Sequence, residues 1–276
     1  MFVPIRKNVL PGFGLSLGTS LLFIYLILLL PISALIMQLS KITFLQYWKI
    51  ITSPQLIAAY KITFLSAGIA SVFNAFFGML MAWILTRYRF PGRTLLDYLI
   101  DLPFALPTAV SGLTLAGLFS INGWYGQFLK PLNIKVSYTW LGIVVAMLFT
   151  SIPFVVRTVQ PVLEELSLEY EEAAQTLGAS SWQIFRRVIL PELAPALLSG
   201  TVLSFIRSLG EFGTVIFIAG NIAWKTEVIS LMIFMRLQEF DYITASAIAS
   251  VILAVSLLLL FIINSLQSNF GYRLGN

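Results

Sequence analysis

The chain has 276 residues, of which 58% are hydrophobic and only 11% are charged. A water-soluble domain usually has about a quarter charged residues, so this composition indicates a polytopic membrane protein. The absence of Cys and His excludes disulfides and thiolate or imidazole ligands, and the net charge of +5, spread over loops without a basic block, argues against nucleic-acid binding.

Six segments are apolar over roughly the 20 residues that a helix needs to cross a bilayer core. In chain order they are Leu15–Met37, Phe64–Leu85, Leu96–Leu118, Trp140–Val159, Ala196–Ile218 and Ile243–Ile263. We expect the first to be a retained span and not a signal peptide, because its apolar core is too long and no small-residue cleavage site follows it. Pro103 and Pro107 predict that the third is kinked or irregular. The sequence therefore predicts an all-α membrane bundle of six transmembrane helices.

Arginine-rich loops set the expected orientation. The short loop after the second segment holds Arg87, Arg89 and Arg93, and Arg6 and Lys7 precede the first segment. Positively charged loops favour the cytoplasmic side. We therefore expect both termini, and the loop between the fourth and fifth segments, to be cytoplasmic. The opposite loops also carry lysines, namely Lys41, Lys49, Lys130, Lys135 and Lys225.

The loop after the fourth segment is predicted to hold two short amphipathic helices. Ser167 is placed to cap the first, whose opening turn carries glutamates that the helix dipole favours. Gly178 is the expected stop, because glycine adopts the left-handed conformation without steric cost. Ser180 and Gln183 have the spacing of a capping box for the second helix, which we expect Pro191 to end.

Helices this short are not stable alone in water, so their apolar faces must pack on something. The pattern superficially resembles a DNA-binding helix-turn-helix, but a recognition helix needs polar residues facing the bases, and here Trp182, Ile184 and Phe185 lead the second helix. Two readings stay open from the residues alone. One is an amphipathic connector lying on the membrane surface, and the other is a docking element for a cytoplasmic partner.

The order and spacing of Glu172-Ala173-Ala174, Gly178, Val188 and Leu190-Pro191 resemble the EAA loop of ABC-importer permease subunits, with Val188 where that pattern usually has Ile. The resemblance implies a type I ABC-importer permease fold, with a single permease domain over 1–276 and a cytoplasmic coupling loop over 161–195. In that family the loop docks in a groove of the ATP-binding subunit. The coupling residues implied here are Glu172, Ala173, Ala174, Gly178, Leu190 and Pro191.

The resemblance extends along the chain through LPFALPTAVSGLTLAGLF, SLGEFGTVIFIAGN and the stretch that begins WKTEVISLMIF. These segments resemble the sulfate/thiosulfate permease subunits of the T (also U) type, with molybdate or tungstate permeases as the alternative. The implied partners are a related W-type permease subunit, two ATP-binding subunits, an extracytoplasmic sulfate-binding protein, sulfate or thiosulfate, and membrane lipid. The implied location is the cell inner membrane, or the plastid envelope if the source is algal.

The energy for transport is expected to come from another chain. No phosphate loop of the form G-x-x-x-x-G-K-[ST] occurs, so we expect this chain to bind no cofactor and to be no enzyme itself, with ATP and Mg²⁺ used by the partner subunit. A stand-alone secondary anion transporter is a rival reading, but few intramembrane carboxylates and no His leave it few proton-coupling groups. A membrane-embedded enzyme is weaker still, since no nucleophile or metal constellation is evident.

Ionisable residues within the fifth segment need a reason, because each costs roughly 2.5–3.5 kcal/mol to insert. Arg207 and Glu211 are one helical turn apart and are predicted to face each other. One interpretation is an internal neutralising pair. The other is that Arg207, Ser204 and Ser208 border the route of a dianion, with Glu211 limiting how tightly it binds.

The third segment supplies further candidates. Irregular backbone at membrane depth is tolerated where it lines a cavity or is packed in protein. The gate or pathway candidates are therefore Pro107, Thr108, Ser111 and Gly112, with close packing of small residues as the alternative. Asp97 and Asp101 are interpreted as salt-bridge partners for Arg89 or Arg93.

Overall fold

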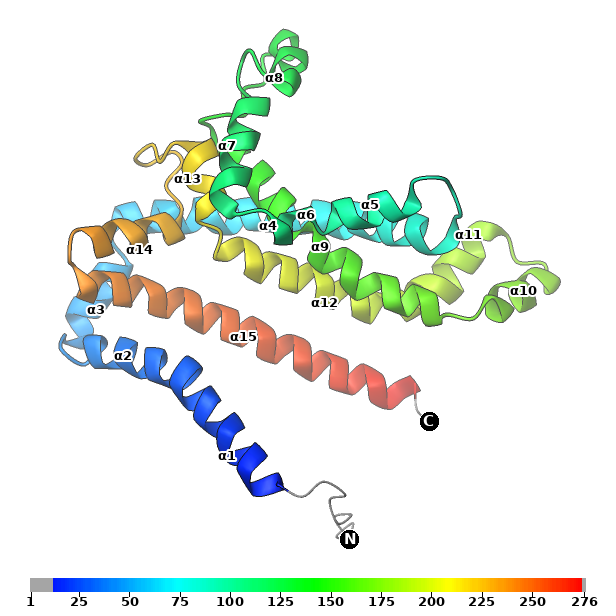
Figure 1. Ribbon diagram of the computed structural model, residues 1–276, viewed down its shortest axis with the longest axis horizontal. Helices are drawn as coiled ribbons and strands as arrows, with labels where there is room; N and C mark the ends of the chain where they lie inside the picture. The colour runs from blue at the N-terminus through cyan, green and yellow to red at the C-terminus, as the bar shows by residue number, and fades with distance from the viewer. Residues whose placement is uncertain (1–11, 275–276) are drawn as a thin grey trace.

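The computed structural model describes residues 12–274, with the backbone alone for residues 266–274, and within that part of the chain every regular element is a helix (Figure 1). The all-α prediction is therefore confirmed. Arg6 and Lys7, which were expected to flank the first span on the cytoplasmic side, lie outside the described residues.

The long helices are α1 (Phe13–Ile24), which continues through the π-helical segment Tyr25–Leu29 into α2 (Leu30–Leu39), α4 (Pro54–Arg87), α9 (Trp140–Glu165), α12 (Leu190–Leu209) and α15 (Tyr242–Leu274). The shorter helices are α3 (Phe44–Ile51), α5 (Arg93–Ile100), α6 (Leu102–Ala105), α7 (Thr108–Leu118), α8 (Trp124–Leu129), α10 (Leu168–Thr176), α11 (Ser181–Ile184), α13 (Gly213–Ala219) and α14 (Ile229–Gln238). Among the described residues, five continuous helices are long and apolar enough to cross a membrane: Phe13–Leu39, Pro54–Arg87, Trp140–Glu165, Ser181–Leu209 and Tyr242–Ser265.

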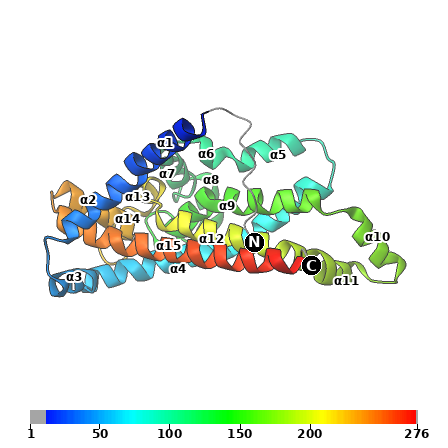
Figure 2. The same cartoon turned by 90° about the horizontal axis from the view of Figure 1, so that it is seen from below.

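The bundle is elongated, and its long helices follow the same axis. Helices α4, α9, α12 and α15 run along the molecule, with α3 and α14 at one end and α10 and α11 at the other (Figures 1 and 2). Helices α4, α9 and α12 pack most extensively on one another, whereas α2 contacts α15 at the periphery. The centre of the molecule is therefore the three-helix contact of α4, α9 and α12.

Small residues allow these three helices to approach closely. A Cβ atom on Gly78 of α4 would lie 2.8 Å from the Cβ of Val155 on α9, and one on Gly200 of α12 would lie 2.9 Å from the Cα of the same valine. Ala67, Ala70 and Ala82 of α4 are also fully buried. Helix association in a membrane depends on such close van der Waals contact, because lipid is as apolar as the side chains it replaces.

The predicted third span, Leu96–Leu118, is not one helix. It consists of α5, α6 and α7, and α7 turns away from the axis of the bundle and carries α8 at its tip (Figure 1). Pro107 disfavours helical backbone at the preceding residue, and Leu106 is extended, with φ −83° and ψ 135°. The expected irregularity is therefore confirmed.

The predicted fifth span, Ala196–Ile218, is also divided. Helix α12 ends at Leu209, and α13 begins at Gly213. Between them the carboxylate of Glu211 accepts a hydrogen bond of 3.0 Å from the backbone N–H of Thr214, which compensates one of the donors left open at the start of α13. The prediction of one span over Ala196–Ile218 missed this break, at which the Glu211 side chain accepts the hydrogen bond that a helix carbonyl would otherwise accept.

Replacing Gly78 with Ala tests the three-helix contact. The added Cβ meets Val155, so we expect the gain in helix propensity to be offset and the free energy of unfolding to fall by about 1–3 kcal/mol. Thermal unfolding in detergent measures this. The matched control is Gly68→Ala on the same helix, where a Cβ would meet nothing within 4 Å, and equal stability of the two variants would contradict the packing argument.

Candidate functional site

Helix α10 begins as the sequence predicts. The side chain of Ser167 accepts a hydrogen bond from the backbone N–H of Glu169 at 3.3 Å, and Glu169 and Glu171 lie in the first turn of the helix. A hydroxyl cap and carboxylates both stabilise this end, where the N–H groups are unpaired and the dipole is positive. The predicted start is confirmed.

The stop at Gly178 is also confirmed. Its φ is +80°, the left-handed conformation that glycine adopts without penalty. Its N–H donates to the carbonyl of Gln175 at 2.9 Å, and the N–H of Ala179 donates to the carbonyl of Ala174 at 3.0 Å. These two bonds form a Schellman motif, which satisfies the last carbonyls of α10 and reverses the chain.

The second helix starts with the expected capping box. The hydroxyl of Ser180 accepts from the N–H of Gln183 at 3.4 Å, and the amide oxygen of Gln183 accepts from the N–H of Ser180 at 2.8 Å. The two helices, α10 and α11, are thus joined by a turn that is fixed at both of its ends. We call the segment from Ser167 to Ile184 the α10–α11 loop.

The prediction that Pro191 ends the second helix is wrong. The helix continues from Ser181 to Leu209 through the π-helical segment Phe185–Ile189, in which the N–H of Leu190 bonds to the carbonyl of Phe185. The wider π turn shifts the hydrogen-bond register just before Pro191, whose missing N–H is tolerated in the first turn of α12. Leu190 and Pro191 therefore lie inside a continuous helix that begins at Ser181, and not in the connecting loop.

The α10–α11 loop carries an exposed leucine beside a hollow. Leu177 is 88% exposed at its tip, and Glu172 and Ala173 are exposed beside it. A hollow of about 370 Å³ is lined by Ala174, Leu177, Gly178, Ala179, Gln183, Ile184, Arg187 and Val188. Docking of a helix in a groove of another protein uses apolar anchors of this kind.

The predicted pair in the fifth segment is present. The Nη1 of Arg207 lies 2.8 Å from the Oε2 of Glu211, although the contact lacks hydrogen-bond alignment and is ionic. Glu211 is 1% exposed, whereas the side chain of Arg207 is 33% exposed. The buried carboxylate also caps α13, and its backbone carbonyl accepts a hydrogen bond from Ser230 at 2.6 Å. Sequence reasoning missed this capping role, although Glu211 is only three residues before Thr214, because the segment was expected to be one span without a break.

The structure places Ser204 and Ser208 in a fully buried polar cluster. Both hydroxyls donate to the Oγ of Ser151 on α9, at 2.9 and 3.1 Å. Asn74 of α4 donates to Ser151 at 2.8 Å, to Ser204 at 3.3 Å and to the carbonyl of Leu148 at 3.2 Å. The cluster links α4, α9 and α12, and hydrogen bonds of this kind hold membrane helices together. Asn74 and Ser151 were missed, although a lone Asn in an apolar run was a visible signal.

The candidates of the third segment meet the start of α13. A Cβ on Gly112 would lie 2.6 Å from the backbone oxygen of Thr214, and one on Gly213 would lie 2.1 Å from the Oγ1 of Thr108. The hydroxyl of Thr214 donates to the carbonyl of Thr108 at 3.2 Å. Ser111 and Gly112 are buried, whereas Pro107 and Thr108 are exposed. The close-packing interpretation therefore holds for Gly112.

Asp97 and Asp101 do not pair with Arg89 or Arg93. Both contact Arg157 of α9, whose Nη1 lies 2.7 Å from Asp97 and whose Nη2 lies 2.6 Å from Asp101. The Nε of Arg157 also donates to Asp101 at 2.9 Å. Because α5 and α6 fold back along α9, the carboxylates face that helix and not the loop before them. Arg157 thus fastens the broken third segment to the bundle.

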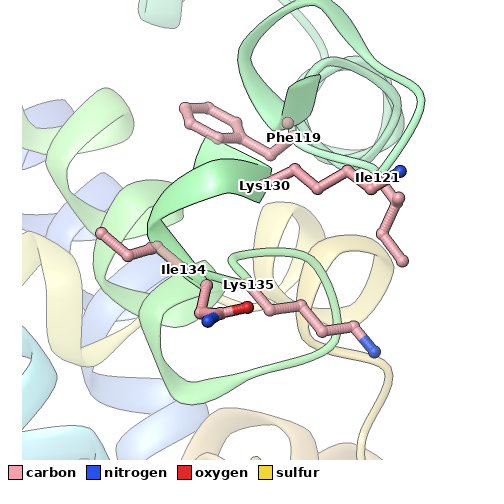
Figure 3. A pocket seen from close by; sticks show the side chains of 7 residues that line it. Phe119, Ile121, Lys130, Ile134 and Lys135 are labelled. Carbon is pink, nitrogen blue, oxygen red and sulfur yellow. The ribbon is translucent and has the colours of Figure 1, made fainter. Parts of the chain in front are cut away.

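A second hollow, of about 270 Å³, lies near the tip of the α7 arm and is lined by Phe119, Ile121, Gly126, Lys130, Asn133, Ile134 and Lys135. Figure 3 shows Lys130 and Lys135 extending toward the same open side of it. Lys225, another of the lysines expected on this side, is not among its lining residues. The fold therefore gathers two of the predicted basic residues at one concave site.

Comparison with known proteins decides the family. Residues 74–276 match the family model described as "Binding-protein-dependent transport system inner membrane component". The chain belongs to this family. The matched region starts at Asn74 and therefore covers the end of α4 and everything that follows, including the α10–α11 loop and the polar cluster.

Members of this family with known roles are close in sequence. The sulfate transport system permease protein CysT of Escherichia coli (strain K12) is 74% identical over 273 residues, which are 99% of each chain. The protein of the same name from Salmonella typhimurium is 76% identical over 267 residues, covering 97% of this chain and 96% of the relative. A crystal structure of a bacterial alginate ABC transporter, in complex with an alginate pentasaccharide-bound periplasmic protein, has a chain with a TM-score of 0.76 at 21% identity and 94% coverage of both. This last likeness concerns the fold alone.

Replacing Arg157 with Gln should loosen α5 and α6. The change leaves two carboxylates without their cation, and because the three side chains are 32% to 42% exposed and so partly screened by solvent, we expect a loss of only about 1 kcal/mol in the free energy of unfolding. Hydrogen exchange of the α5 amides should rise with it. The control is Arg93→Gln on α5, since among the described residues Arg93 forms no ion pair. Similar exchange in both variants would show that Arg157 is not the fastener.

Proposed function

We propose that this chain is the membrane-spanning permease subunit of an ATP-driven importer of sulfate or thiosulfate. The observation that carries the proposal is the 74% identity, over 99% of both chains, with the sulfate transport system permease protein of Escherichia coli. The family model, which matches residues 74–276, supports the same class.

The α10–α11 loop is proposed to dock on an ATP-binding subunit through Glu172, Ala173, Ala174 and Gly178. The exposure of Leu177 and the hollow behind it support this role, because an apolar projection next to a concavity fits a protein groove. Leu190 and Pro191 are proposed to carry a movement of the α10–α11 loop into the membrane, since they are the first two residues of α12, which continues to Leu209. ATP and Mg²⁺ would be used by that partner and not by this chain.

The proposed orientation places the α10–α11 loop in the cytoplasm. The arginine-rich loop between α4 and α5 lies at the same end of the molecule as α10 and α11, and α3 and α14 lie at the opposite end (Figure 1). The positive-inside tendency then assigns both loops to the cytoplasm. The described start of α1 and the end of α15 also point toward this end, as cytoplasmic termini require.

Arg207 is the proposed contact for the anion within the membrane. Its side chain keeps one-third of its surface exposed while its partner Glu211 is buried, so the guanidinium retains donors for a passing dianion. Glu211 lowers the local positive charge and thereby prevents tight retention. Pro107, Thr108 and Ser111 lie on the adjoining segment and are proposed to shape the gate, with Ser204 and Ser208 supporting it from the buried cluster.

A complete transporter needs further chains. We propose a related W-type permease subunit, two ATP-binding subunits and an extracytoplasmic sulfate-binding protein as partners. The exposed apolar surface of α7 and α8, which stand away from the bundle, is compatible with burial against lipid and a second permease.

Co-purification followed by reconstitution tests the function. We expect an ATP-binding subunit and a second permease to purify with this chain, and the complex in liposomes to accumulate radioactive sulfate only with ATP and the binding protein. ATP hydrolysis should be stimulated by sulfate or thiosulfate and not by molybdate. Stimulation by molybdate alone would change the substrate assignment, and sulfate uptake by the isolated chain without ATP would indicate a secondary transporter.

Replacing Gly178 with Val tests the coupling loop. A β-branched residue at φ +80° is strained by about 1–2 kcal/mol or more, so the turn between α10 and α11 should open and ATP-dependent uptake should be lost while the chain still inserts. Uptake and membrane content are measured together. Gly92→Val is the control, because Gly92 has φ +89° and equally open surroundings but lies before α5. Full uptake in the Gly178 variant would remove the loop from the mechanism.

A further inference from the structure

If the α10–α11 loop receives a movement from a partner, as proposed above, α10 needs a contact through which it can move the helix bundle. It lies at the extremity of the molecule, and the helix that it contacts most is α11, over a small area (Figures 1 and 2). The chain leaves α9 through Leu166, which is extended, and returns through the turn at Gly178. A helix of nine residues held only by its two connections could swing without displacing the membrane helices.

One ion pair ties α10 directly to the end of α4. The Nη2 of Arg87, the last residue of α4, lies 2.6 Å from the Oε1 of Glu171. The two side chains are only 14% and 19% exposed, so the pair is shielded from water and screened less by salt than a surface pair. The next residue, Glu172, is exposed. Adjacent carboxylates therefore face different ways, one toward the bundle and the other toward the surface proposed for the ATP-binding subunit.

Aromatic side chains hold Arg87 in place. Its guanidinium carbon lies 5.8 Å from the ring centre of Trp83, one turn earlier on α4. The Trp83 ring meets Phe185 edge to face with the centroids 6.0 Å apart, and Phe185 stacks on Trp182 at 5.6 Å. A cation over an aromatic face is attracted to it, and rings in contact restrict its rotamers. Arg87 is thus fixed on both sides of the loop, by Glu171 of α10 and by the aromatic group that reaches α11.

The pairing is selective among many candidates. Four other arginines lie near this end of the molecule, and Glu169 and Glu172 share the first turns of α10 with Glu171. Among the described residues, none of these forms an ion pair within 4.0 Å. The other arginines are Arg89, Arg93, Arg186 and Arg187. The contact is therefore built into the fold and is not an average of a mobile charged surface.

We propose that Arg87 and Glu171 are positioning residues that make α4 follow α10, so that a displacement imposed on the loop reaches the membrane helices. The inference rests on the proposed function, because it requires a partner that moves α10. Helix α4 can pass the displacement on, since Asn74 bonds it to α9 and α12 and Gly78 packs it against Val155. Loss of the ion pair would then disconnect the α10–α11 loop from α4, while the surface proposed for docking stays intact.

The test uses the complete complex in liposomes. We expect Arg87→Gln and Glu171→Gln each to lower ATP-dependent sulfate uptake by about tenfold, in line with typical coupling energies, while the bound ATP-binding subunit and its ATP hydrolysis remain within about twofold of the unmodified complex. Hydrolysis without transport is the sign of uncoupling, which a merely destabilised protein would not give.

Charge reversal separates the ion pair from the residues that form it. The double variant Arg87→Glu with Glu171→Arg should regain at least about a third of the lost uptake, because opposite charges again face each other. Glu169→Gln is the matched control in the same helical turn and should transport normally. Uptake unchanged in Glu171→Gln, or a double variant no better than either single one, would overturn the proposal.

Two further outcomes are distinguishable. If the single variants lose the ATP-binding subunit on purification, Glu171 belongs to the docking surface and the positioning role is wrong. If the unmodified complex takes up no sulfate with ATP, the proposed function fails before the ion pair is tested.

Discussion

The contact of α4, α9 and α12 around Asn74 is the constraint on which the rest of the structure depends. A buried amide is costly unless its hydrogen bonds are made, and Asn74 meets them only when all three helices present the right faces. One turn further along, Gly78 admits Val155 so closely that neither helix can rotate or slide without a clash. The hydrogen bonds of Asn74 and the close packing at Gly78 therefore favour the same arrangement, and together they fix how α4, α9 and α12 are aligned.

The irregular segments next to this centre are held by specific polar contacts. The break between α12 and α13 is stabilised by Glu211, which caps α13, pairs with Arg207 and receives Ser230 at its carbonyl. The break before α7 meets it through Thr108 and Thr214. Interrupted backbone within a membrane bundle requires such substitutes for the missing helical bonds. Glu211, which caps α13, therefore also holds the partly exposed Arg207 beside the two breaks.

The proposed mechanism joins these two regions. A partner that displaces the α10–α11 loop would act on Arg87 through Glu171, and so on the full length of α4. Because Asn74 connects α4 to α12, the displacement would reach the end of α12, where Arg207 lies. Packed helices with fixed polar contacts transmit such movement as a unit, since close-packed interiors do not deform continuously. Movement of α10 and α11 would then control the surroundings of Arg207, which lies at the far end of α12.

The sequence by itself determined the helical class, most spans and the local geometry of the loop. Features such as the stop at Gly178 depend on a few neighbouring residues, and the hydropathy of a span depends on composition, so both can be read along the chain. The partner of Asp97 and Asp101 could not, because Arg157 is 56 residues beyond Asp101 and meets it only after α5 and α6 fold back along α9. The passage of a helix through Pro191 was likewise decided by the tertiary structure, since a continuous helix buries Ile184, Ile189 and Leu193 in one core, and that gain belongs to contacts between distant helices.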